Sequence, residues 1–208
     1  MTAMRNVLLF IACCVMHFRV FGQAEVPTSP LSDNTVPCGE LCFYGVDFSN
    51  AQVYGATESD LQFLAAFRGI NSLLVSDPGK YNLRRLVNRD VAVYPVPADN
   101  LNDNMDFSRF RTYNPQPQKR DLTEVTASYE LPHRSGTGMV FVAWLLNKAK
   151  AEAVYTVVVF DVESREILFE SDVVSRAGGF GLRNYWANTV YDIIRSDALA
   201  KKISRALK

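Results

Sequence analysis

The sequence lacks an excess of charge of either sign. Its 22 Lys and Arg residues balance 22 Asp and Glu residues, so the formal net charge at pH 7 is zero. Nucleic-acid-binding domains usually carry a basic surface, and this balance argues against a DNA- or RNA-binding role. The sequence also lacks an uncharged apolar run of about 18 residues, the length that a membrane-spanning helix needs. We expect no nucleic-acid partner and no transmembrane span after signal cleavage.

Side chains that bind metals or act as nucleophiles are also scarce. The chain has four Cys and two His, and beyond residue 22 only Cys38, Cys42 and His133 remain. A closed zinc site needs four ligands. His133 lies near Ser135 in the sequence, but a nucleophile and its base also need a third group that orients them. We therefore predict no catalytic residue, no metal site and no cofactor.

The N-terminus has the pattern of a secretory signal peptide. Arg5 is the only early charge, and residues 7–16 form an apolar run. Small or medium residues precede a cleavage site that we place after Gly22. A second possibility is lipidation of Cys13 instead of this cleavage, which would tether the chain to a membrane.

Cys38 and Cys42 lie four residues apart, with Gly39 between them to allow a bend. In an oxidising compartment such a pair can close a small disulfide loop. Free thiols and a chemically active pair remain as alternatives. The C-x-x-x-C spacing differs from the C-x-x-C spacing of redox-active pairs.

Composition divides the chain into four parts. Residues 1–22 are the predicted signal peptide, and residues 23–41 are a Pro-rich linker. With 48% apolar residues, residues 42–195 are expected to fold as a single domain. Residues 196–208 form a basic C-terminal tail, which could touch an acidic membrane or a partner. A solvated or frayed terminus is the simpler interpretation of this tail.

Hydrophobic periodicity predicts the elements of the domain. We expect strands at 42–47, 51–54, 91–94, 139–146, 153–161 and 166–174, and helices at 58–76, 121–129 and 181–195. Residues 95–120 have no sustained period and are expected to form a long irregular surface loop. These elements predict an α/β (α+β) fold, a mixed sheet of about five strands with a C-terminal antiparallel meander, packed by two or three helices.

The first long helix has a recognisable start. Thr57 is followed three residues later by the carboxylate of Asp60, which favours a cap at Thr57. Leu61 then begins a series of apolar residues at helical spacing, so we expect Leu61 on the buried face.

A glycine-rich turn precedes the last predicted helix. Gly178, Gly179 and Gly181 could present backbone N–H groups to an anion, with Arg176 and Arg183 adding positive charge. The alternative is that these glycines only allow a tight reversal of the chain.

Exposed aromatic residues are candidate partner contacts. We assign this role to residues of the 95–120 loop and of the glycine-rich turn: Phe107, Phe110, Tyr113, Phe180 and Tyr185.

Several short motifs resemble those of envelope proteins. The segment 160–171, FDVESREILFES, resembles a hairpin of the curli secretion channel subunit, the TolB amino-terminal domain and the LpoB-type activators of penicillin-binding proteins. Segments 44–49, 145–150 and 178–188 are similar to an uncharacterised family of secreted Gram-negative envelope proteins.

These resemblances imply a place and a class of function. They imply a protein exported to the periplasm or the outer-membrane periphery, where it acts as a non-enzymatic interaction or assembly domain. Its partner would be another envelope protein or a second copy of itself. A periplasmic protein that binds a small ligand or anion at the glycine-rich turn is the alternative.

Overall fold

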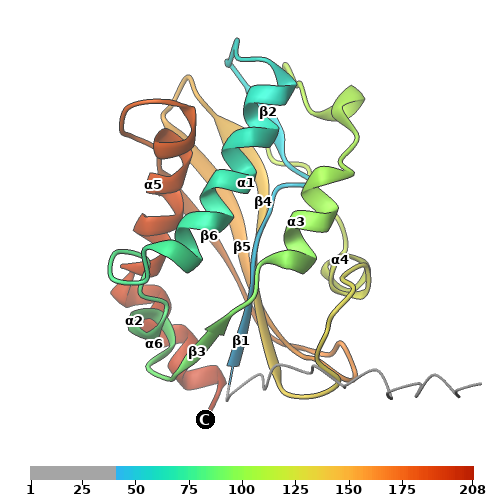
Figure 1. Ribbon diagram of the computed structural model, residues 1–208, viewed down its shortest axis with the longest axis vertical. Helices are drawn as coiled ribbons and strands as arrows, with labels where there is room; N and C mark the ends of the chain where they lie inside the picture. Colours follow the sequence, from blue (N-terminus) through green and yellow to red (C-terminus); the bar gives the residue numbers. More distant parts are fainter. Residues whose placement is uncertain (1–40) are drawn as a thin grey trace, which may run out of the picture. The chain divides into compact units, whose positions relative to one another are not determined.

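The computed structural model describes residues 41–208 (Figure 1). The predicted signal peptide, the possible lipidation site Cys13, nearly all of the Pro-rich linker and Cys38 lie outside the described residues. The proposed Cys38–Cys42 disulfide therefore stays a prediction.

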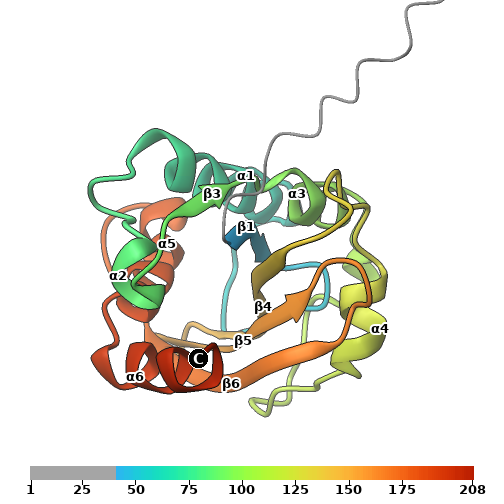
Figure 2. The same ribbon diagram turned by 90° about the horizontal axis from the view of Figure 1, so that it is seen from below.

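The described chain forms one sheet with helices on both faces (Figures 1 and 2). The strands are β1 (Leu41–Asp47), β2 (Gln52–Tyr54), β3 (Val91–Val93), β4 (Thr137–Asn147), β5 (Glu152–Asp161) and β6 (Ile167–Arg176). The helices are α1 (Asp60–Ser76), α2 (Arg84–Val87), α3 (Val96–Asp103), α4 (Leu122–Ala127), α5 (Leu182–Ile194) and α6 (Asp197–Ala206), with a 3-10 turn, η1, at Phe107–Arg109.

The sheet combines a parallel half and an antiparallel half. Its strand order is β3-β1-β4-β5-β6, and β2 pairs with β4 beyond the end of β1. β1 runs parallel to both β3 and β4, whereas β4, β5 and β6 form an antiparallel meander. The predicted α/β class and the C-terminal meander are confirmed, with six strands and six α-helices in the part of the chain that the structure describes.

Both faces of the central strands are buried, because successive side chains point to opposite faces and are apolar on each. On the α1 face, Phe43, Phe141 and Val157 join a core that includes residues of α1, α5 and α6. On the opposite face, Tyr44 and Trp144 pack with residues of α4. Figure 2 shows α1 and α5 on one side of the strands and α4 on the other. We call these the α1 face and the α4 face.

A bulge in β1 changes which side chains reach each face. The pairing of β1 with β4 shifts between Phe43 and Val46, and Gly45 has a φ of 97°. A β-carbon at Gly45 would lie 3.0 Å from the Cβ of Pro95. Glycine therefore allows both the backbone angle and the close approach.

Helix α1 begins later than the sequence pattern predicts. Ser59, not Thr57, is the N-cap, and it forms a capping box with Gln62. The start at Asp60 places the bulky Phe63 on the buried face, whereas Leu61 is 76% exposed. The assignment of Leu61 to the core was therefore wrong.

Residues 95–120 contain more structure than predicted. Pro97 lies in the first turn of α3, a place where proline is favoured because those N–H groups have no helical acceptor. Phe110 is only 1% exposed and contacts Phe63 and Phe67 edge-on, with ring centroids 5.0 and 6.0 Å apart. The segment is anchored to the core and is not a long irregular loop.

The C-terminal tail forms part of the folded unit. Ser196 caps α6, and Leu199 and Ile203 lie in the same core as α1 and α5. The Arg89 guanidinium donates to the Leu207 carbonyl, which ties the end of α6 to the chain after α2. A solvated terminus was the wrong interpretation, because α6 buries one apolar side. Within residues 41–208, no helix combines the length and the hydropathy needed to cross a bilayer.

Candidate functional site

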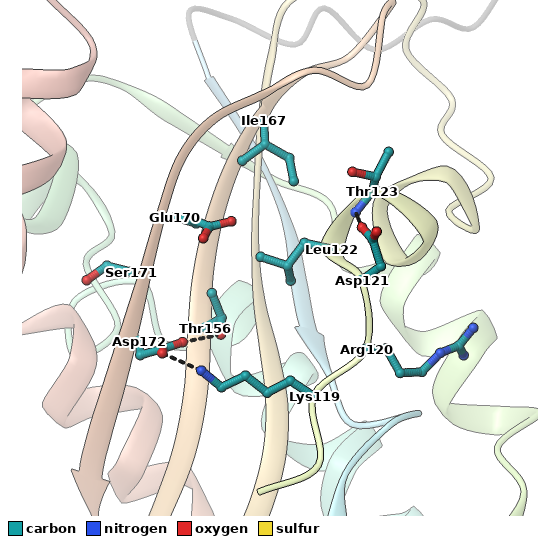
Figure 3. A pocket seen from close by; sticks show the side chains of 10 residues that line it. All are labelled: Lys119, Arg120, Asp121, Leu122, Thr123, Thr156, Ile167, Glu170, Ser171 and Asp172. Atoms are coloured by element: carbon teal, nitrogen blue, oxygen red, sulfur yellow. Dashed lines mark hydrogen bonds and ion pairs between the residues drawn. The ribbon is translucent and has the colours of Figure 1, made fainter.

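A cleft of about 540 Å³ opens on the α4 face, between the last two strands and the segment that leads into α4 (Figure 3). Its lining is strongly polar, and it consists of Lys119, Arg120, Asp121, Leu122, Thr123, Thr156, Ile167, Glu170, Ser171 and Asp172.

A chain of hydrogen bonds runs from the core to this cleft. The buried indole N–H of Trp144 donates to the Thr156 hydroxyl at 2.8 Å, and that hydroxyl donates to Asp172 Oδ1 at 2.7 Å. Lys119 forms an ion pair with Asp172 Oδ2, and Figure 3 shows these two side chains pointing toward each other.

These partners stabilise the ionised form of Asp172. Burial acts to raise its pKa, but the hydrogen bonds from Lys119 and Thr156 outweigh burial and lower the pKa below its ordinary value. Asp172 is therefore ionised at neutral pH, with a partner at each oxygen. This arrangement favours a structural carboxylate that positions Lys119, rather than a group that accepts protons.

The same side of the molecule carries a free sheet edge. β6 is the last strand in the sheet order and has ten residues. The N–H of Ala177 donates back to the Ala151 carbonyl, whereas the N–H of Arg176 donates away from β5, to Asp192 Oδ2. Because backbone groups alternate in direction along a strand, those of Asp172 and Val174 point outward like that of Arg176. No strand within residues 41–208 pairs with this edge. At its end, α5 covers the backbone of Arg176, whose N–H and C=O bond to the side chains of Asp192 and Asn188.

The exposed side chains of β6 are partly apolar. Val174 is 64% exposed and Leu168 is 41% exposed, although they belong to a regular strand. Natural edge strands are commonly short or shielded by charges, so a long edge with exposed apolar residues is a candidate protein-binding surface.

The crevice at the carboxyl end of β1 is filled by the protein itself. β3 and β4 flank β1 in parallel, and α/β sheets usually bind ligands at such a switch point. Here the Asn71 amide accepts from the Val46 N–H at 2.8 Å, and the Asn102 amide accepts from the Phe48 N–H at 2.6 Å. Both amides are fully buried and also donate to the Val46 carbonyl. They act as a clamp on the bulged strand.

Asp47 also lies at this end of β1 and is fully buried. It accepts hydrogen bonds from the Tyr129 hydroxyl at 2.7 Å and from the Ser49 N–H at 2.8 Å. Burial raises its pKa above the ordinary value, while its hydrogen bonds oppose that shift. Sequence reasoning missed Asp47 and the Asn clamp, because single polar residues within apolar patterns gave no sign of their distant partners.

His133 is buried, whereas Ser135 is exposed. The His133 side chain is 6% exposed, and its Nδ1 lies 3.0 Å from the Tyr44 hydroxyl and 3.7 Å from the Cys42 sulfur. Tyr44 and Cys42 are fully buried in the α4-face core. The cluster therefore supplies polar contacts within the core. Among residues 41–208, no three His, Cys, Asp or Glu side chains are grouped to hold a metal ion.

Several groups of the glycine-rich turn are bonded or packed within the chain. The Gly178 N–H donates to the Tyr185 carbonyl at 3.0 Å, and Gly181, with a φ of 79°, is the N-cap of α5. Arg183 bonds to the side chain of Asn184 and packs against Gly69, where a β-carbon would lie 2.7 Å from its Cδ. Arg176 is exposed, as is Gly179. These contacts favour a structural turn over an anion site.

The five predicted partner contacts lie in different environments. Tyr113 is 99% exposed and Phe180 is 95% exposed, so both are accessible. Phe107 and Tyr185 are half-buried against the core. Phe110 cannot contact a partner, because it fills the core between α1 and the sheet.

No family model matches this chain, and no curated protein matches it.

Proposed function

We propose that this chain is a non-enzymatic interaction domain of the cell envelope that binds another protein through the open edge of β6. The observation that carries the proposal is the outward-facing backbone of Asp172 and Val174 on a ten-residue terminal strand. Export to the periplasm or the outer-membrane periphery is supported by the signal pattern of residues 1–22 and by the envelope-protein motifs.

The edge offers both affinity and selectivity to an added strand. The outward N–H and C=O groups supply main-chain hydrogen bonds, and side chains that alternate along the strand select the partner. Glu170 and Arg176 are exposed on β6, while Leu168 and Val174 supply apolar contacts. The partner is therefore an extended segment with apolar and complementary charged residues, from an envelope protein or from a second copy of the chain.

A second copy fits one particular register. If two β6 strands pair antiparallel with Val173 opposite Val173, the outward backbone groups of Asp172 and Val174 bond to each other across the pair. The side chain of Glu170 then lies opposite that of Arg176 in both halves, although the backbone groups of Arg176 stay bonded to α5. Opposite charges that face each other across strands stabilise such pairing. Self-association thus uses the same edge and does not need a separate surface.

The test is site-specific photo-crosslinking of the full-length gene product in its own cells. A photoreactive residue at Val174 should give a defined cross-linked product. The matched control is Val75 on α1, which is 54% exposed and lies on a helix. Equal cross-linking at both positions, or none at Val174, would contradict the proposal. Light scattering of the purified protein then distinguishes a homodimer from a complex with another protein.

A further inference from the structure

A second surface is formed by two helices that are far apart in the sequence. α2 and α6 lie side by side near the C-terminal end of the chain (Figures 1 and 2). Between them is a hollow of about 340 Å³. It is lined by Arg85, Leu86, Asn88, Ala200, Lys201, Ser204, Arg205 and Lys208. Four of these residues are cations and none is an acid.

Packing directs these cations outward. Leu86 on α2 and Leu199 and Ile203 on α6 are buried in the α1-face core. The opposite side of α6 is therefore left to Lys201 and Arg205, both exposed. The two helices are held together by this apolar contact, and the positive side chains border the hollow from both sides.

Asp90 and Asp197 lie near α2 and α6 in the sequence, but neither forms an ion pair with the cations that line the hollow. Arg84 forms an ion pair with Asp90 at 3.0 Å. Within residues 41–208, no ion pair involves Arg85, Lys201, Arg205 or Lys208. Cations near the end of a helix stabilise its dipole. That effect applies both to Arg205, in the last turn of α6, and to Arg85, in the last turn of α2. It does not account for the position of both cations around one hollow.

We infer that this hollow binds a phosphate group. Arg85 and Arg205 can each donate two hydrogen bonds to phosphate oxygens, and Lys201 adds a compact positive charge. Ser204 and Asn88 provide neutral donors in the same lining. The phosphate can belong to a lipid headgroup or to a soluble anion, because both present the same oxygens. The inference is independent of the β6 edge.

The experiment measures binding of two probes to the full-length exported protein. Calorimetry with inorganic pyrophosphate tests a soluble phosphate. Co-sedimentation with phosphatidylcholine vesicles, with and without phosphatidylglycerol, tests a lipid headgroup. We expect binding that weakens as salt is added, since exposed charges are screened.

The variants distinguish binding in the hollow from nonspecific attraction to positive charge elsewhere on the protein. Lys201→Gln with Arg205→Gln should weaken binding by at least about tenfold, because charge-assisted hydrogen bonds are lost. Arg85→Gln should also weaken binding, from the other helix. The matched control is Arg176→Gln with Arg183→Gln, which removes the same charge at the glycine-rich turn. All four changed positions of the two double variants are exposed, so melting temperatures should stay close to that of the parent protein.

Each outcome decides the inference. Binding of either probe that is lost in the α2 and α6 variants and kept in the control supports the site, and the probe that binds identifies the source of phosphate. No binding of either probe overturns the inference. Equal loss in the control variant would show nonspecific charge attraction, and loss in the control alone would move the site to the glycine-rich turn.

Discussion

The hydroxyl of Tyr129 donates a 2.7 Å hydrogen bond to Asp47, a carboxylate that has no solvent exposure. Tyr129 follows α4, and Asp47 ends β1, so this bond connects the α4 side of the core to the parallel half of the sheet. Its loss leaves a buried carboxylate oxygen without that partner.

Replacing Tyr129 with Phe should lower the free energy of unfolding by about 1–3 kcal/mol, the cost of leaving a buried polar group unsatisfied. Denaturant unfolding checks this value. Tyr113→Phe is the matched control, since Tyr113 is 99% exposed and its hydroxyl faces solvent. An equal effect of the two changes would mean that the Tyr129–Asp47 bond adds no stability.

Asp47 should also make stability depend on pH in a defined direction. Burial raises its pKa in the folded state above the ordinary value of 3.8. At a pH between the ordinary pKa and the raised folded-state pKa, Asp47 binds more protons in the folded state than in the unfolded state. The free energy of unfolding therefore falls as pH rises through this range. The stabilising contribution is complete below the unfolded pKa and is lost as pH rises through the folded pKa.

Asp47→Asn isolates this contribution, because other carboxyls titrate in the same range. Unfolding free energies of both proteins, measured from about pH 4 to about pH 7, give the difference. The parent protein should lose stability relative to the variant as pH rises. A difference that is constant or grows with pH would contradict the raised pKa.

The Asn clamp on β1 gives a third prediction. Asn71→Ala removes the acceptor for the Val46 N–H, which then lies buried without that bond. We expect a loss of about 1–3 kcal/mol in unfolding free energy. Asn100→Ala on the exposed side of α3 is the control and should change stability by less than about 0.5 kcal/mol.

The sequence predicted the elements whose periodicity is strong. Met139 and Val140 begin an alternation in β4 that fills both faces of the sheet, and the helix predicted at 181–195 forms as α5, with Trp186 and Val190 on its buried side. Such patterns depend only on neighbours within one element. The meander and the last helix could therefore be predicted from local sequence.

Features that depend on distant partners could not be predicted in this way. Phe110 sits in a proline-containing segment and is buried only because α1 and the sheet leave space for its ring. In the sequence, Asn71 and Asn102 cannot be told from exposed polar residues. Their role becomes clear only from the structure, where both amides donate to the Val46 carbonyl. Arg85 and Lys201 come together because α2 packs on α6. Each of these features needs tertiary contacts that no local pattern contains.

The burial of α6 yields a fourth prediction. Ile203 has no exposure and packs in the α1-face core. Ile203→Ala should lower the unfolding free energy by about 2–5 kcal/mol, through lost apolar burial and the cavity left behind. Ser204→Ala, on the exposed side of the same helix, should have little effect. Unchanged melting of Ile203→Ala would mean that residues 196–208 do not contribute to the folded core.

The direction of backbone groups in β6 yields the last prediction. The Val174 N–H points away from β5, so Val174→Pro removes no hydrogen bond of the existing sheet. The Val173 N–H points toward β5, opposite Tyr155, so Val173→Pro removes one. We expect Val174→Pro to stay folded with a melting temperature near that of the parent. Val173→Pro should lose about 3 kcal/mol or more.

Val174→Pro also tests how β6 binds its partner. A photoreactive residue at Leu168 should cross-link to the partner in the parent background, and Val174→Pro should abolish that product because an added strand loses a main-chain donor. Val174→Ala is the control, because it keeps the N–H and removes only apolar surface. Loss of the product in both variants would assign binding to the Val174 side chain, whereas persistence in Val174→Pro would show that the partner does not extend the sheet.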